Sequence, residues 1–121
     1  MFSCLALSLV ACHRQAGAAS TVSIETEIQP QPVVAGPVVV TTRLADANGR
    51  PVTNAHLIVE GDMSHPGMSP IFGEAKELPG GRYQAQLQFA MAGDWVLLLH
   101  LTLPGGQALE RQVDVKGVRA K

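Results

Sequence analysis

Apolar and polar residues alternate along most of this chain, and turn residues interrupt the alternation about every ten residues. The segment 21–28 (TVSIETEI) places Val22, Ile24 and Ile28 on one side and polar residues on the other. Successive side chains in a strand point to opposite faces of a sheet, so a period of two indicates strands with one buried face. No segment sustains the 3.6-residue period of an amphipathic helix. The pattern therefore predicts an all-β fold.

Six segments are predicted as strands, and residues 73–78 (GEAKEL) are a short seventh candidate. The six are 21–28, 37–46, 55–61, 80–91, 94–104 and 108–117. Asn48-Gly49 is a tight-turn signal between two of them. The segment 94–104 (DWVLLLHLTLP) is apolar without alternation, so we expect both of its faces to be covered. We predict a single immunoglobulin-like β-sandwich of about seven strands, with Trp95 in its core.

The N-terminal segment MFSCLALSLVAC is apolar and too short to cross a bilayer as a helix. It is typical of the apolar region of a secretory signal. Its last four residues, Leu9-Val10-Ala11-Cys12, resemble the bacterial lipobox, in which the cysteine is acylated and becomes the mature N-terminus. We therefore predict a lipoprotein signal peptide over residues 1–11, a flexible tether over 12–20 and the folded domain over 21–121. The segment departs from the signal pattern in one respect, because no Lys or Arg precedes the apolar run. The alternative is an ordinary secretory signal with an incidental cysteine.

The lipobox hypothesis also predicts a location and a redox chemistry. Cys4 would leave with the signal and Cys12 would carry lipid, so the mature chain would have no free thiol for a disulfide or a thiolate metal site. The protein would be membrane-anchored through Cys12 in the cell envelope, facing the periplasm or the extracellular side. In lipobox proteins an Asp after the cysteine commonly directs inner-membrane retention. This chain has His13 there, which favours the outer membrane.

Charge and motifs exclude several classes of function. The net charge is −1 and the Lys and Arg residues are scattered, so we expect no nucleic-acid partner. The chain has no Gly-x-Ser-x-Gly motif, no cysteine nucleophile after processing and no glycine-rich phosphate loop before a helix. We therefore expect that it is not an enzyme.

The stretch GDMSHPGMSP, residues 61–70, concentrates residues that are rare elsewhere in the chain. The whole sequence has four methionines and four histidines, and this loop holds Met63, His65 and Met68. Pro66-Gly67 suits the centre of a type II turn, which would hold the Cα atoms of His65 and Met68 within about 7 Å. Met63 can reach the same side if the chain is extended there. Thioether sulfur is soft and neutral, so this donor set favours Cu(I) over Mg²⁺, Ca²⁺ or Zn²⁺.

Each methionine also has a structural interpretation. Methionine often fills gaps in cores, and a loop methionine packed over the end of a sandwich is ordinary. Met91 precedes the turn at Ala92-Gly93 and is equally consistent with a third sulfur ligand or with a core position at a strand end. The spacing Met-x-His-x-x-Met alone is a weak motif. The sequence by itself leaves these alternatives open.

The remaining polar candidates are weaker. Glu60 and Asp62 are candidate partners that would orient His65, as is common for metal-bound imidazoles. His56 begins the strand that leads into the loop, so we expect it at the opposite end of that strand. His100 lies among leucines and is predicted as a half-buried histidine with a satisfied hydrogen bond.

Residues 55–115 resemble the YtkA/FixH-like domain family of extracytoplasmic bacterial proteins. The resemblance is carried by VEGDMSHPGM (59–68), GRYQAQLQFAMAGDW (81–95) and VLLLHLTL (96–103). It implies an immunoglobulin-like sandwich and, for many members, association with copper handling or respiratory oxidase assembly. It also implies that Met91 stands at the position of the family's methionine.

Two functions of different classes follow. The first is a lipid-anchored metal-binding domain that holds or passes Cu(I) through Met63, His65, Met68 and Met91, with a copper-handling or oxidase partner protein. The second is an immunoglobulin-like interaction module without metal, which docks on a membrane protein complex through the loop. Methionine-bearing loops are adaptable contact surfaces, so the sequence is consistent with both.

Overall fold

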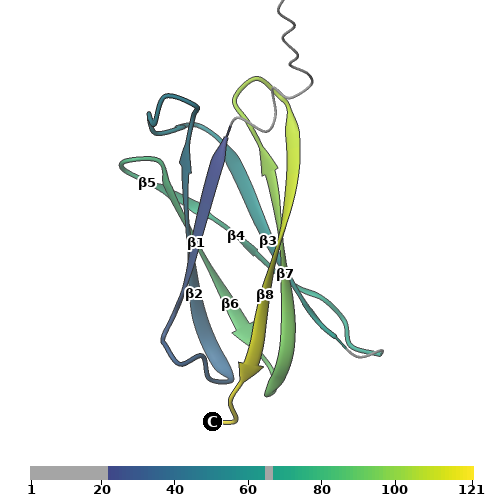
Figure 1. Cartoon of the computed structure of the whole chain (residues 1–121). Helices are drawn as coiled ribbons and strands as arrows, with labels where there is room; N and C mark the ends of the chain where they lie inside the picture. Colours follow the sequence, from purple (N-terminus) through teal and green to yellow (C-terminus); the bar gives the residue numbers. More distant parts are fainter. Residues whose placement is uncertain (1–21, 65–66) are drawn as a thin grey trace, which may run out of the picture.

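The chain forms a sandwich of two antiparallel β-sheets (Figure 1). The computed structural model describes residues 22–64 and 67–121, and the regular secondary structure in these ranges consists of β-strands alone. The strands are β1 (Ser23–Gln29), β2 (Gly36–Ala45), β3 (His56–Met63), β4 (Ile71–Glu74), β5 (Lys76–Leu78), β6 (Arg82–Phe89), β7 (Gly93–Thr102) and β8 (Ala108–Val118). Within the described ranges, no helix is long and apolar enough to cross a bilayer. The predicted signal, Cys12 and the tether lie outside the described residues, as do His65 and Pro66.

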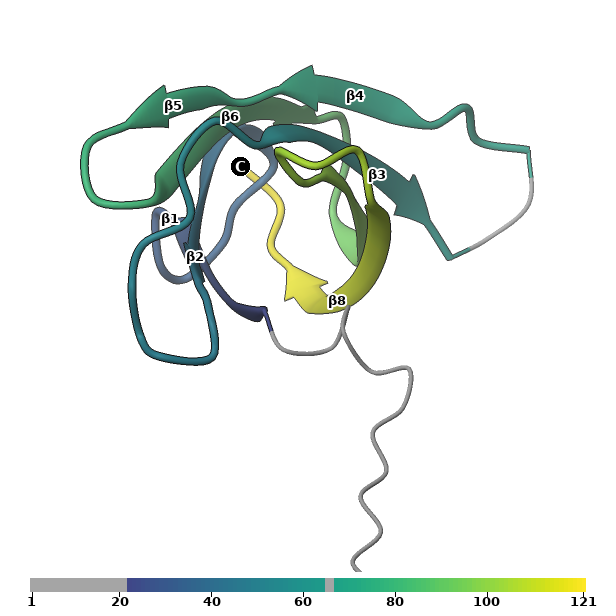
Figure 2. The same cartoon turned by 90° about the horizontal axis from the view of Figure 1, so that it is seen from above.

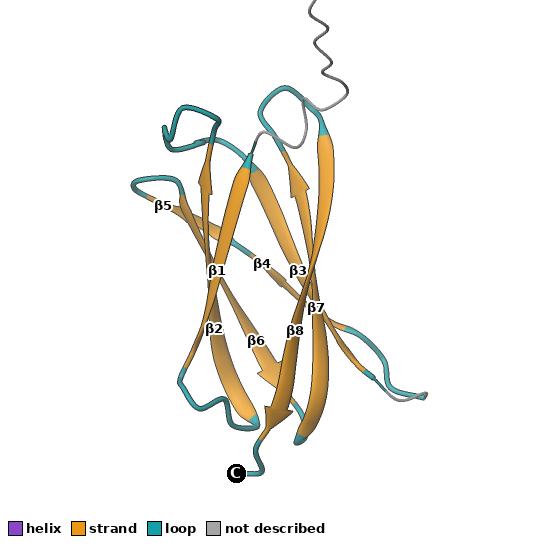
Figure 3. Ribbon diagram, viewed as in Figure 1, coloured by secondary structure: helices purple, strands orange, loops and turns teal. Residues whose placement is uncertain are grey.

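Each sheet has four strands, in the orders β1-β2-β6-β5 and β4-β3-β7-β8. Figure 3 shows the strands running lengthwise through the molecule, and Figure 2 shows the two layers from above, around a common interior. The predicted all-β, immunoglobulin-like sandwich is confirmed, with eight strands. The short candidate at 73–78 contributes to two strands, β4 and β5, which brings the number of strands to eight.

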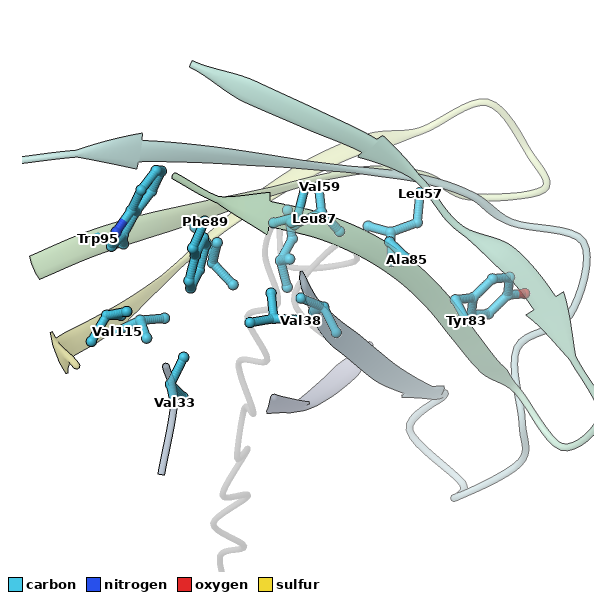
Figure 4. Close-up of a cluster of buried hydrophobic side chains, with 14 of the residues drawn as sticks. Val33, Val38, Leu57, Val59, Tyr83, Ala85, Leu87, Phe89, Trp95 and Val115 are labelled. Carbon is cyan, nitrogen blue, oxygen red and sulfur yellow. The ribbon is translucent and has the colours of Figure 1, made fainter. Parts of the chain in front are cut away.

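Alternate residues of the central strands point into the space between the sheets and form the core. Trp95, the predicted core residue, is 2% exposed. Its indole stacks on Phe89 of β6, with 4.5 Å between ring centroids and 16° between ring planes. Figure 4 shows the two rings side by side at one end of the core. Burial of an aliphatic or aromatic side chain of this kind contributes about 1.5–3 kcal/mol to stability.

Tyr83 fastens the connection between β2 and β3 to the other end of the core. Its hydroxyl donates to the carbonyl of Val52 (2.8 Å) and accepts from the backbone N–H of Ala55 (3.2 Å). Burial raises the pKa of Tyr83, so the phenol stays protonated and available as a donor. Two residues earlier, Gly81 has φ +77° and its carbonyl accepts from the N–H of Leu44. The Gly-x-Tyr motif is thus a structural one.

The chain passes from one sheet to the other between β4 and β5. β4 pairs with β3, and β5 pairs with β6, with Ala75 between them donating its N–H to the carbonyl of Leu57. Gly73 of β4 lies directly against β6, because a Cβ atom there would overlap the backbone carbonyl of Gln86. A glycine is therefore what lets the crossing strand lie directly on β6.

The expectation that both faces of residues 94–104 are covered was wrong. β7 alternates strictly between buried residues and partly exposed ones, and its outward side chains Val96, Leu98 and His100 are partly exposed. The segment reads as continuously apolar because two of these outward positions are also aliphatic. The outer face of β7 is not covered by any element among the described residues.

Candidate functional site

Met63 lies at the end of β3, where the strand reaches the edge of the core. It pairs with Trp95 in the ladder to β7, points inward and is 9% exposed. Its methyl carbon lies only 2.9 Å from the position that a Cβ atom on Gly93 would take. Gly93 also has φ +131°, a conformation that favours glycine. The Met-x-Gly-x-Trp motif therefore keeps space for the side chain of Met63.

Met91 lies in the turn between β6 and β7 and is 41% exposed. Its carbonyl oxygen accepts a hydrogen bond from Nε1 of Trp95 at 3.0 Å. Trp95 is therefore the ladder partner of Met63 and the hydrogen-bond donor to the backbone of Met91. This arrangement brings two of the four predicted ligand residues to the same end of the sandwich.

Met91 also lines a recess of about 320 Å³ at this end of the molecule. Phe89 and Gly36 contribute to its walls, together with the C-terminal residues Ala120 and Lys121. The recess borders both sheets, because Phe89 ends β6 and residues 90–92 lead into β7. The side chain of Met91 is thus accessible from solvent beside a recess with both polar and apolar walls.

Met68 lies on the connection from β3 to β4, five residues after Met63. Figures 1 and 2 show residues 67–70 of this connection projecting from the body of the sandwich. Gly67 has φ +91°, as the predicted turn requires, and Met68 is 36% exposed. Met63 and Met91 thus lie at one end of the sandwich, Met63 buried and Met91 exposed, and Met68 lies on an exposed connecting segment. The predicted turn partner His65 lies outside the described residues.

Asp94 holds this end of the sandwich together, and the sequence analysis missed it. Its backbone carbonyl accepts from the N–H of Ser64 (3.2 Å), and its Oδ1 accepts from the N–H of Gly117 (2.8 Å). The residue sits in a register irregularity between Gly93 and Trp95. Asp94 thereby ties the start of the methionine loop and the end of β8 to the start of β7. The signal for it was an Asp between the glycine and the tryptophan of one motif.

The acidic candidates point away from this end, onto the outer face of the sheet. Glu60, proposed as a partner of His65, instead pairs with Nε2 of His100 at 2.8 Å. That hydrogen bond lowers the pKa of Glu60, while burial and the neighbouring Glu60 raise the pKa of Asp62. The prediction that His100 is half-buried and satisfied is confirmed. His56 begins β3, at the opposite end of that strand from the methionine loop, also as expected.

The donor set can be compared with the chemistry of metal ions. In residues 22–64 and 67–121, no three His, Cys, Asp or Glu side chains are close enough together to hold a metal ion. The methionines around Trp95 and on the adjacent segment offer thioether sulfurs, which are soft neutral donors. Donors of that kind fit Cu(I) and do not fit Mg²⁺ or Ca²⁺.

A family model shows to which protein family this chain belongs. The model of the YtkA-like family matches residues 18–100, which is 83 of the 121 residues. This chain belongs to the YtkA-like family. The match begins further upstream than the resemblance noted in the sequence and ends within β7. The two motifs noted in the sequence, Gly81-Arg82-Tyr83 and Met91 to Trp95, lie inside it.

The YtkA-like chain is also similar to solved structures at low sequence identity. The soluble domain of PmoD from Methylocystis sp. ATCC 49242 is 17% identical, with 83% of this chain and 90% of that chain covered and a TM-score of 0.48. Murine CRIg is 12% identical, with 83% of this chain and 98% of that chain covered and a TM-score of 0.45. No curated protein matches the chain significantly.

Proposed function

We propose that this YtkA-like chain is a non-enzymatic module of the cell envelope that binds Cu(I) as cargo. The observation that supports the proposal most directly is that Met63 and Met91 lie at the same end of the sandwich, the first paired with Trp95 in the strand ladder and the second bonded to its indole through a backbone carbonyl, with the exposed Met68 on the connection from β3 to β4. In the proposal these three thioethers and the imidazole of His65 hold the ion. A copper-handling or oxidase-assembly protein would deliver or receive it.

The chemistry of the donors supports copper over other metals. Thioethers carry no charge and no proton in the physiological range, so they compete poorly for hard cations and well for Cu(I). Both cysteines of the chain lie within its first twelve residues, so the folded domain has no thiolate. A methionine site suits an oxidising compartment, where free thiols are liable to form disulfides.

We expect Met63→Leu, Met68→Leu and Met91→Leu each to weaken Cu(I) binding at least about tenfold, equivalent to about 1.4 kcal/mol. Leucine keeps the volume of methionine and removes the sulfur, so each exchange should cost less than about 1.5 kcal/mol of stability. The measurement is competition for Cu(I) against a chelator under reducing conditions. Phe72→Leu is the control, because it changes an exposed apolar side chain near the loop that has no sulfur.

The same competition at two pH values identifies the nitrogen ligand. An imidazole must be neutral to bind a metal and its ordinary pKa is about 6.5, so affinity should fall below about pH 6. His65→Met should keep Cu(I) binding and lose most of this pH dependence. Equal affinities for the parent and all three leucine variants would contradict the proposed copper site.

The anchor is tested separately. We expect Cys12→Ser to move the protein from the membrane fraction to the soluble fraction of the envelope, because the acylated thiol would be absent. Cell fractionation and immunoblotting measure this distribution. A Cys12→Ser protein that stays with the membranes as the parent does would contradict lipid anchoring through Cys12, without bearing on copper.

A second function is supported by the distribution of exposed apolar side chains. The large hydrophobic residues exposed in the described ranges are Met68, Phe72 and Met91. Met68 and Phe72 lie on or just after the connection from β3 to β4, and Met91 lies in the turn between β6 and β7. Such side chains suit a protein contact as well as a metal. A ligand that binds only the folded state must raise the melting temperature, so Cu(I) that leaves it unchanged would favour the interaction module.

A further inference from the structure

The outer face of the sheet β4-β3-β7-β8 carries a group of apolar side chains. Ile58 of β3 and Val96 and Leu98 of β7 are partly exposed, and Phe72 of β4 is 61% exposed. Cross-strand pairing places Phe72 opposite Glu60, and Glu60 opposite Leu98. We call the outward residues in the three cross-strand rows through Ile58, Glu60 and Asp62 the outer-face patch.

The charges in the outer-face patch have one sign. It contains five carboxylates and no Lys or Arg among its eleven positions. The carboxylates are Glu60, Asp62, Glu74, Glu110 and Asp114. The patch thus holds five of the chain's ten Asp and Glu residues, and the exposed Lys116 lies just beyond it on β8. The patch is thus an apolar centre on an acidic surface.

The outer face of the other sheet differs in both respects. There Glu25 of β1 lies opposite Arg43 of β2, which lies opposite Arg82 of β6, so this face carries charges of both signs. The outward positions of β6 after Arg82 are Gln84, Gln86 and Gln88. This sheet has an ordinary solvated face, and its contrast with the outer-face patch argues that the patch has a specific role.

Part of the patch is held in place before any partner arrives. The ring of His100 bonds Glu60 at 2.8 Å, and Glu60 lies directly across from Leu98. A fixed carboxylate beside an aliphatic side chain needs little reorganisation to meet a cation and an apolar group together. The other outward side chains of the patch also lie on paired strands, so their backbone needs little reorganisation on binding.

We propose that the outer-face patch docks a protein partner whose surface presents apolar side chains flanked by Lys or Arg. The apolar centre would be buried in the contact, and the carboxylates would attract the partner and select its sign of charge. A second copy docked through the same patch would bring five carboxylates against five others. An anionic lipid surface would be repelled for the same reason. This proposal is independent of copper.

The probe is a synthetic peptide of alternating leucine and lysine, titrated into the ¹⁵N-labelled protein at low salt. Two matched peptides, alternating leucine with glutamate and serine with lysine, separate the apolar and the charge requirement. We expect the leucine–lysine peptide to shift the amide resonances of β3, β4 and β7 and to bind at least tenfold more tightly than either control. Binding should weaken with added salt, because exposed charges are screened.

Variants assign the binding to this face. Glu110→Lys with Asp114→Lys should weaken the leucine–lysine peptide at least tenfold, and Phe72→Ser should weaken it as well. Glu25→Lys with Glu27→Lys makes the same charge change on exposed positions of β1 and should alter affinity less than twofold. Equal weakening by both double variants, or shifted resonances on β1, β2 and β6, would overturn the proposal. Analytical sedimentation tests the remaining alternative. If the parent protein forms a dimer and Phe72→Ser abolishes it, the proposal would be overturned and the patch would be assigned to a second copy.

Discussion

Trp95→Ala should lower the free energy of unfolding by about 3–5 kcal/mol, the range for removal of a large buried aromatic side chain. The indole is 2% exposed, so truncation leaves a cavity in the core instead of a solvated gap. The change also removes the stack on Phe89 and the hydrogen bond to the carbonyl of Met91. Urea unfolding followed by circular dichroism measures this loss of stability. Fluorescence is unsuitable, because Trp95 is the chain's one tryptophan and the variant lacks it.

Two further variants make this result interpretable. Phe72→Ala truncates an aromatic residue that is 61% exposed and should change stability by less than about 0.5 kcal/mol. Trp95→Phe keeps most of the ring and loses the indole N–H, so its cost should fall between the other two. If Trp95→Ala were no more destabilising than Phe72→Ala, the indole would not lie in the core. We also expect Trp95→Phe to weaken Cu(I) binding, because the backbone of Met91 loses its anchor.

Gly73→Ala should destabilise the domain by about 3 kcal/mol, the upper end of the range for overpacking a closely packed site. The added Cβ would overlap the backbone carbonyl of Gln86, which cannot rotate away as a flexible side chain would. β4 would have to move off β6 where the chain passes between sheets. The melting temperature should fall by about 10 °C or more, since 1 kcal/mol corresponds to about 4–8 °C in a domain of this size.

Gly105→Ala is the matched control for this substitution. Gly105 has open space around its Cβ position and lies in the turn between β7 and β8, so the exchange should change stability by less than about 0.5 kcal/mol. Similar melting temperatures for the two alanine variants would mean that β4 does not approach β6 as closely as the structure indicates. The comparison separates the cost of close strand packing from the general effect of replacing glycine.

The strands were predictable because their information is local. A period of two, the turn residues between segments and the position of Trp95 all reflect which side of a strand is buried, and each can be seen within about ten residues. The positive φ of Gly67 was predictable for a similar reason, since a Pro-Gly pair favours one turn type. The division of residues 71–78 between two sheets was not, because it depends on the contact of Gly73 with a strand that comes later in the chain.

In the candidate site, too, local features were predictable and contacts between distant segments were not. The methionine-bearing loop could be identified from residue types and spacing, and Met91 became a candidate through its place before a turn and the family resemblance. The partner of Glu60 could not, because His100 is forty residues away and reaches it only when β3 and β7 pair. The role of Asp94 was hidden for the same reason, since its two partners, Ser64 and Gly117, come from other parts of the chain.

The sequence by itself therefore determined the class of fold, the buried side of most strands and the soft-donor character of the loop. Only the tertiary structure decided that Met63 packs in the core, that the backbone carbonyl of Met91 accepts from the indole of Trp95, and that the aliphatic outer side of β7 is left uncovered. The physical reason is that alternation records which residues avoid water, whereas strand pairing between distant segments selects their neighbours. A continuous apolar run such as 95–101 is compatible with one covered face or two, and the order of strands in the sheets resolves it.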